Sequence, residues 1–120
     1  MKAEDLYMEI TLKGEVLMVE GFAELTAANC KLFRKQVCAA LNGHTVVEID
    51  LSRTALVDCA GLGALVVIRN LTRDRKGAVR LLNPTPPVQQ LLDLVRAGEI
   101  FEIVNGQTAA DLPVARPGTV

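Results

Sequence analysis

A stretch of fourteen residues joins a β-branched run to a glycine-rich helix start, and it reads Asp50-Leu51-Ser52-Arg53-Thr54-Ala55-Leu56-Val57-Asp58-Cys59-Ala60-Gly61-Leu62-Gly63. Asp58 suits the N-cap position, because its carboxylate can accept hydrogen bonds from the unpaired N–H groups of a first helical turn, a contribution of about 1 kcal/mol. Gly61 and Gly63 each weaken a helix by about 1 kcal/mol relative to alanine. Two glycines in one first turn therefore predict close approach of another backbone, from a neighbouring strand or from a second chain.

Segments on either side of this stretch carry the patterns of strands and helices. Alternating or β-branched apolar residues predict a hairpin at 6–12 and 16–19 and strands at 46–51, 79–82 and 100–104. Helical spacing predicts helices at 27–41 and 60–75, a third that starts in the proline turn at 83–87 and ends at Gly98, and a short one at 107–112. The order β-β-α-β-α-β-α-β predicts an α/β fold with a mixed sheet, whose later strands are parallel and joined by right-handed crossovers.

Composition limits the classes of function. The chain has 120 residues, half of them hydrophobic, which predicts one folded domain at residues 1–112 followed by a flexible C-terminal tail at 113–120. A formal charge of −1 argues against direct binding of nucleic acid or of an acidic membrane surface. The acidic start and the absence of a long apolar run argue against a signal peptide and against membrane insertion. We therefore expect a cytoplasmic protein.

The cysteines and the single histidine argue against metal binding and catalysis. Cys30, Cys38 and Cys59 form no CxxC pair, and His44 is the only histidine, so a Cys/His metal cluster is excluded. His44 precedes the strand at 46–51 and should therefore lie about 15–20 Å from Cys59, too far to act as its base. Neither a dinucleotide fingerprint nor a phosphate loop is present. We expect no cofactor, no metal and no enzymatic activity, with Cys30 and Cys38 in or beside the core.

The stretch Asp58-Cys59-Ala60-Gly61-Leu62-Gly63 closely resembles the Asp-Ser-x-Gly-Leu-Gly signature of STAS domains, in particular the bacterial anti-sigma factor antagonists. The likeness extends in element order from about Val16 to Val104. It implies a STAS-like fold, in which a mixed sheet of about four to five strands carries helices packed mainly on one side. It also implies a partner-binding and switch site at the signature itself, formed by Asp58, Cys59, Ala60, Gly61, Leu62 and Gly63.

Cys59 stands where the family carries the serine that a kinase anti-sigma factor phosphorylates. A standard serine kinase cannot act on this position, so the resemblance implies that the usual phospho-switch is lost. Ser52, the only serine of the chain, and Thr54 lie in the preceding loop and are alternative acceptors. Glu24 is the nearest candidate for the family's acidic residue near the first helix.

The resemblance implies a non-catalytic module that binds an anti-sigma factor of the serine kinase type and thereby releases a sigma factor. We expect a monomer or a weak homodimer. One alternative is a STAS subunit of another assembly, such as a transporter or a signalling complex. Another is a thiol redox sensor, because the positive end of a helix can lower the pKa of a cysteine at position 59, although Asp58 opposes this effect.

Overall fold

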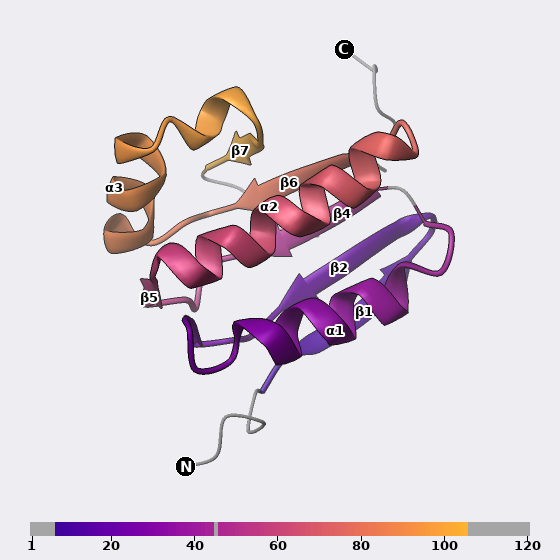
Figure 1. The fold of residues 1–120 in the computed structure, drawn as a ribbon, viewed down its shortest axis with the longest axis horizontal. Coiled ribbons are helices and arrows are strands. Elements are labelled where there is room, and N and C mark those ends of the chain that lie inside the picture. The colour runs from indigo at the N-terminus through magenta and orange to yellow at the C-terminus, as the bar shows by residue number, and fades with distance from the viewer. Residues whose placement is uncertain (1–6, 45, 106–120) are drawn as a thin grey trace.

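A five-stranded mixed sheet forms the centre of the computed structural model, which describes residues 7–44 and 46–105 (Figure 1). The strand order is β1-β2-β4-β6-β7. β1 and β2 form the predicted antiparallel hairpin, and all later neighbours in this sheet are parallel. The strands are β1 (Glu9–Lys13), β2 (Val16–Glu20), β4 (Val46–Asp50), β6 (Ala78–Leu82) and β7 (Glu102–Val104). The α/β fold class and the mixed sheet predicted from the sequence are confirmed.

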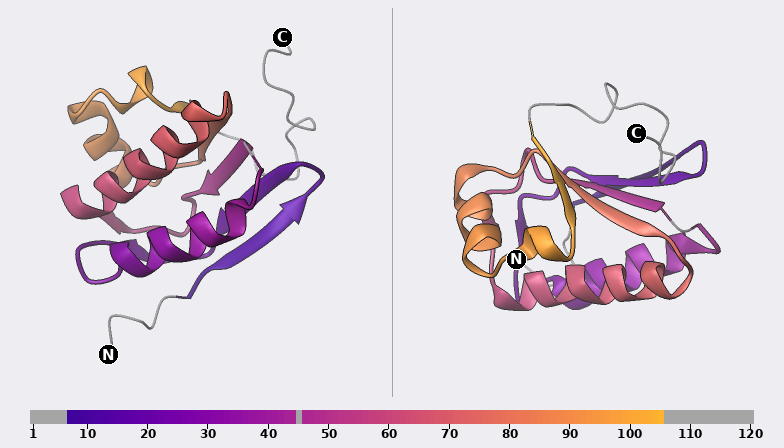
Figure 2. Two further views of the ribbon diagram at one scale, coloured as in Figure 1. Left: turned by 45° about the vertical axis from the view of Figure 1, so that its right-hand side comes forward. Right: turned by 90° about the horizontal axis from the view of Figure 1, so that it is seen from above.

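Helices α1 (Cys30–Leu41) and α2 (Cys59–Asp74) lie side by side on one face of this sheet (Figure 2). Helix α3 (Pro86–Leu94) follows β6 and packs near the edge of the sheet, and a short 3-10 helix, η1 (Ala97–Glu99), leads into β7. This arrangement confirms the expectation of helices mainly on one side.

The core between sheet and helices is aliphatic apart from three phenylalanines. Because side chains alternate along a strand, one face of each central strand points at α1 and α2. Phe22 and Phe33 meet edge to face with ring centroids 5.1 Å apart. The main buried contributors are Leu17, Val19, Val47, Ile49, Val79 and Leu81 from the sheet and Phe33, Val37, Leu65 and Ile68 from the helices.

The opposite face of the sheet carries an ion-pair network across three strands. Glu48, Arg80 and Glu102 are in register on β4, β6 and β7. Arg80 donates to the Glu48 carboxylate at 2.8 Å and to the Glu102 carboxylate at 3.1 Å. Glu48 is buried, so its carboxylate depends on Arg80 for compensation of its charge.

The start of the first helix differs from the prediction. Helix α1 begins at Cys30 rather than Ala27, because a turn occupies residues 26–29. The Asn29 side chain accepts from the Thr26 N–H at 3.0 Å, and the Thr26 hydroxyl accepts from the Ala28 N–H at 3.2 Å. These short polar side chains satisfy backbone groups that a helix would otherwise use. Helix α2 starts at Cys59, one residue before the predicted start.

The end of the third helix and the last strand are also shifted. Helix α3 ends at Leu94 rather than at Gly98, and Gly98 lies inside η1. The chain leaves the helix at Arg96, which has a left-handed backbone with φ 56°. The N–H groups of Ile100 and Phe101 are bound to the Ala97 carbonyl, so β7 starts only at Glu102. The helix predicted at 107–112 and the tail predicted at 113–120 lie outside the described residues.

Candidate partner-binding site

A small second sheet fixes the loop that leads into α2. It pairs β3 (Glu24–Leu25) with β5 (Leu56–Val57) in parallel, and neither strand is predicted from the sequence. The Ala55 N–H donates to the Ala23 carbonyl at 2.8 Å and the Asp58 N–H to the Leu25 carbonyl at 3.2 Å. The segment before α1 therefore lies directly against the segment before α2.

Asp58 is the N-cap of α2, as predicted. One of its carboxylate oxygens, Oδ1, accepts from the Gly61 N–H at 2.8 Å, and the other, Oδ2, accepts from the Ala27 N–H at 3.0 Å. These backbone hydrogen bonds lower the pKa of Asp58 because they stabilise the charged carboxylate, and the bond from Gly61 has the largest effect. The bond to Ala27 is not predicted, since nothing local to Asp58 indicates a partner 31 residues away.

The two glycines of the signature have different surroundings. Gly61 is buried, and a Cβ added to it would lie only 2.0 Å from the carbonyl oxygen of Leu25 in β3. Gly63 is exposed, and an added Cβ would meet nothing within 4 Å. The close approach predicted for this pair thus comes from a neighbouring strand at Gly61, whereas the space beside Gly63 is open.

Several exposed residues lie on the two short strands and on the first turns of α2. In β3 and β5 the buried residues are Leu25 and Val57, while Glu24 and Leu56 pair in register and point outward. Leu56 is 48% exposed, a high value for a leucine in a strand. Cys59 is exposed and lies one turn before Gly63, on the same side of α2. We refer to Glu24, Leu56, Cys59 and Gly63 as the front surface.

The remaining signature residues contribute less to this surface. Ala60 and Leu62 are half-buried, and Leu62 packs against the core. Gly61 packs against β3, where a Cβ would lie 2.0 Å from the Leu25 carbonyl oxygen, so its role within the fold is close packing.

The two alternative phospho-acceptors differ in accessibility. Thr54 is 0% exposed, and its hydroxyl donates to the Phe22 carbonyl at 2.8 Å. Phosphorylation of Thr54 would therefore require the folded loop to open, because the hydroxyl is buried and hydrogen-bonded. Ser52 is exposed, and its N–H donates to the Asp50 carboxylate at 2.9 Å.

The other candidate side chains are not part of this surface. His44 follows α1 and precedes β4, whereas Asp58 follows the other end of that strand. Cys30 and Cys38 are half-buried on α1. Within residues 7–44 and 46–105, no group of three or more His, Cys, Asp or Glu side chains gathers in a way that could hold a metal ion.

A family model described as the STAS domain matches residues 7–110, most of the chain. The chain belongs to the STAS domain family. A comparison with curated proteins finds no match for this STAS domain. None of the helices in the described ranges is both long and apolar enough to cross a bilayer.

Solved structures with this fold include anti-sigma factor antagonists. One from Mycobacterium paratuberculosis has a TM-score of 0.77 and 16% identity, over 90% of this chain and 91% of the other. An anti-sigma-factor antagonist (STAS) domain protein from Planctomyces limnophilus has a TM-score of 0.75 and 17% identity, over 86% and 93%. The Bacillus cell fate determinant SpoIIAA in its phosphorylated form has a TM-score of 0.69 and 18% identity, over 88% and 95%. At these identities the likeness establishes the fold.

Proposed function

We propose that this STAS domain is a non-catalytic binding module of a partner-switching system, which docks an anti-sigma factor of the serine kinase type and thereby releases a sigma factor. The observation that carries the proposal is the front surface, in which Leu56, Cys59 and Gly63 are all exposed at or just before the start of α2. Small or absent side chains at 59 and 63 let a second backbone come close, and Leu56 offers apolar area. The module works in the cytoplasm as a monomer or a weak homodimer.

Loss of the phospho-switch follows from the chemistry of position 59. SpoIIAA, which shares the fold, has been solved in both unphosphorylated and phosphorylated forms. A phosphate on this position would add about −1.5 to −2 charges beside the Asp58 carboxylate and would repel an acidic partner surface. Cys59 offers no hydroxyl to a serine kinase. The module is therefore held in its binding-competent form, or is controlled through Ser52 or through the partner.

The direct test adds charge at the front surface. The full chain is used to capture its partner from the native host, and the purified partner is titrated calorimetrically with wild type and with Cys59→Asp. We expect Cys59→Asp to weaken binding about tenfold or more, because a second carboxylate beside Asp58 must be desolvated at the interface. Ala39→Asp is the matched control, since Ala39 is exposed near the far end of α1 and its variant should bind as wild type does.

Two results would overturn the proposal. Equal affinity of wild type and Cys59→Asp would place the interface elsewhere. A captured partner without a kinase-like ATPase domain would exclude the proposal that the module binds an anti-sigma factor of the serine kinase type. In addition, Cys59→Ser should restore phosphorylation by such a kinase, and a variant that binds the kinase but stays unmodified would show that residues around position 59 have changed too.

A different assembly is the second candidate. The murine anion transporter Slc26a9 contains a region with this fold, which matches 78% of this chain but only 16% of the transporter, with a TM-score of 0.64 and 21% identity. Recovery of a transporter or a signalling complex in the capture experiment would favour this alternative.

The exposure of Cys59 also favours a test of the thiol-sensor hypothesis. Iodoacetamide should react with Cys59 faster than with free cysteine at neutral pH if the helix end activates the thiol. If Cys59 reacts no faster than free cysteine, the thiol-sensor hypothesis is wrong.

A further inference from the structure

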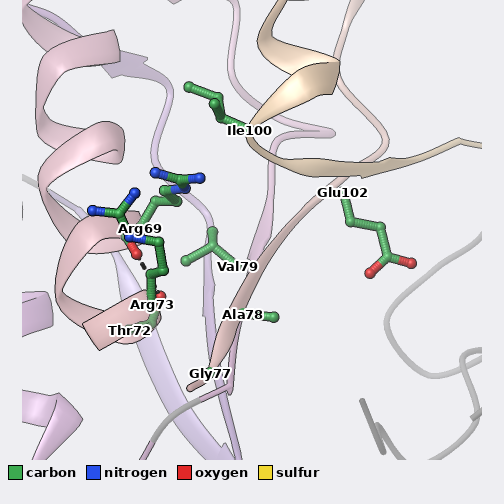
Figure 3. Close-up of a pocket in the computed structure, with 8 residues that line it drawn as sticks. All are labelled: Arg69, Thr72, Arg73, Gly77, Ala78, Val79, Ile100 and Glu102. Atoms are coloured by element: carbon green, nitrogen blue, oxygen red, sulfur yellow. Dashed lines mark hydrogen bonds between the residues drawn. The ribbon is translucent and has the colours of Figure 1, made fainter. Parts of the chain in front are cut away.

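A cavity of about 190 Å³ lies between the second half of α2, the start of β6 and the connection from η1 to β7 (Figure 3). Arg69 and Arg73 both line it. They are four residues apart on α2, so their side chains leave the same face of the helix. Arg73 is about 21 Å along the helix from Cys59, so this cavity is separate from the front surface.

Neither arginine has a carboxylate partner among the described residues. The ion pairs within residues 7–44 and 46–105 involve Arg80 and Arg96, not Arg69 or Arg73. Arg69 donates once, to the Asn70 side chain at 3.1 Å. Glu102 also lines the cavity, but its carboxylate accepts from Arg80, and Figure 3 shows it turned away from the two arginines. Two guanidinium groups thus bring uncompensated positive charge to one small space.

Favourable interaction with the dipole at the C-terminal end of α2 can explain the position of Arg73 but not that of Arg69. Arg73 lies in the last turn of α2, where a cation interacts favourably with the helix dipole. Arg69 is half-buried and more than one turn before the end at Asp74, where this effect has faded. Like charges four residues apart also repel each other and weaken a helix. A bound anion would remove this repulsion.

The other groups of the cavity define what kind of anion fits. The Thr72 hydroxyl already donates to the Arg69 carbonyl at 2.9 Å, and the Gly77 N–H donates to the Thr72 carbonyl at 2.7 Å. The guanidinium groups therefore supply the hydrogen-bond donors that are free to bind a ligand. Planar guanidinium groups pair with phosphate oxygens two at a time. Val79 turns toward the arginines in Figure 3, and Ile100, which is 40% exposed, lines the same space, so the two add apolar area to the cavity.

We propose that Arg69 and Arg73 form a binding site for a small phosphate ester with a short aliphatic part. The phosphate lies between the two guanidinium groups, and the aliphatic part lies against Val79 and Ile100. The cavity, at about 190 Å³, is below the range of roughly 300–1,000 Å³ that is typical of pockets for larger ligands, so the ligand is compact.

The test is an NMR titration of the full chain at low, constant ionic strength, observing the Arg Nε–Hε groups and the backbone amides. The probes are inorganic phosphate and propyl phosphate. We expect saturable shifts at Arg69, Arg73 and residues 77–79, with propyl phosphate binding about fivefold more tightly because part of its chain is buried. Arg69→Gln/Arg73→Gln should weaken binding about tenfold or more per arginine removed.

Arg75→Gln is the matched control, because Arg75 is exposed at the end of the same helix but does not line the cavity. It should bind both probes as wild type does, and all variants should remain folded, as judged by their backbone amide spectra. Shifts that do not saturate, or that persist in the double variant, would overturn the proposal. A blocked phosphoserine tripeptide provides a third probe, and a tenfold preference for it over propyl phosphate would overturn the assignment to a small molecule.

Discussion

Gly61 and Gly63 show, at the scale of single residues, how one sequence pattern can have two physical origins. Both glycines interrupt the first turns of α2, and both cost helix stability. Only Gly61 is required by the fold, because the Leu25 carbonyl occupies the space of its side chain. Gly63 has free space around it, so the fold of the free protein does not require a glycine there.

Alanine substitutions distinguish these two origins. Gly61→Ala should lower the free energy of unfolding by about 2 kcal/mol, since backbone of β3 would have to move. Gly63→Ala should raise it by about 0.5–1 kcal/mol through helix propensity alone. Urea denaturation of both variants measures these differences. Equal effects of the two substitutions would contradict the distinction made from their surroundings.

The same substitution at Gly63 also bears on the proposed function. If the partner's backbone comes close at the front surface, Gly63→Ala should bind the partner more weakly although the free protein is more stable. Unchanged binding by calorimetry would show that the partner does not approach α2 at this point.

At the scale of elements, Asp58 couples the start of α2 to the turn before α1. An ordinary N-cap serves only its own helix, whereas the second oxygen of Asp58 accepts from the Ala27 N–H. This bond helps to hold β3 against β5 and so shapes the front surface. The residue that marks the helix start in the sequence thus also positions a second segment.

Substitutions of Asp58 should therefore affect stability in a pH-dependent way. Asp58→Ala should cost about 1–2 kcal/mol at pH 7, from loss of the cap and of the bond to Ala27. Because hydrogen bonding lowers the folded-state pKa below the ordinary value of 3.8, this contribution is complete well above pH 3.8. It declines as the pH falls below that value toward the folded-state pKa. Urea denaturation at pH 7 and at pH 3 measures the change.

Asp58→Asn is the matched control for charge. Its amide oxygen can still cap Gly61, but its NH₂ group cannot accept from Ala27, so the loss of stability should lie between those of wild type and Asp58→Ala. A difference between wild type and Asp58→Ala that is the same at both pH values would contradict the role of the charged form.

At the scale of the whole molecule, the two proposed sites occupy opposite halves of α2 and should act independently. The front surface and the arginine cavity share no residue, and mutational effects more than about 10 Å apart usually add. Cys59→Asp should leave the NMR chemical-shift changes caused by phosphate unchanged. Arg69→Gln/Arg73→Gln should leave the affinity for the protein partner unchanged. A change of either affinity by more than about threefold would indicate coupling through the helix.

Local patterns in the sequence determined the element order, the mixed sheet, the aliphatic core and the cap at Asp58, because hydrophobic period and capping chemistry depend on residues close in the chain. Tertiary structure decided the rest. The β3–β5 pairing, the burial of Thr54 and the fit of Gly61 against Leu25 join segments about thirty residues apart. The cavity beside Arg69 and Arg73 exists only because β6 and the connection from η1 to β7 lie beside the second half of α2. Which residues are exposed for binding depends on contacts between distant segments; the glycine pair predicts a close approach, but only the tertiary structure identifies Leu25 as the neighbour of Gly61.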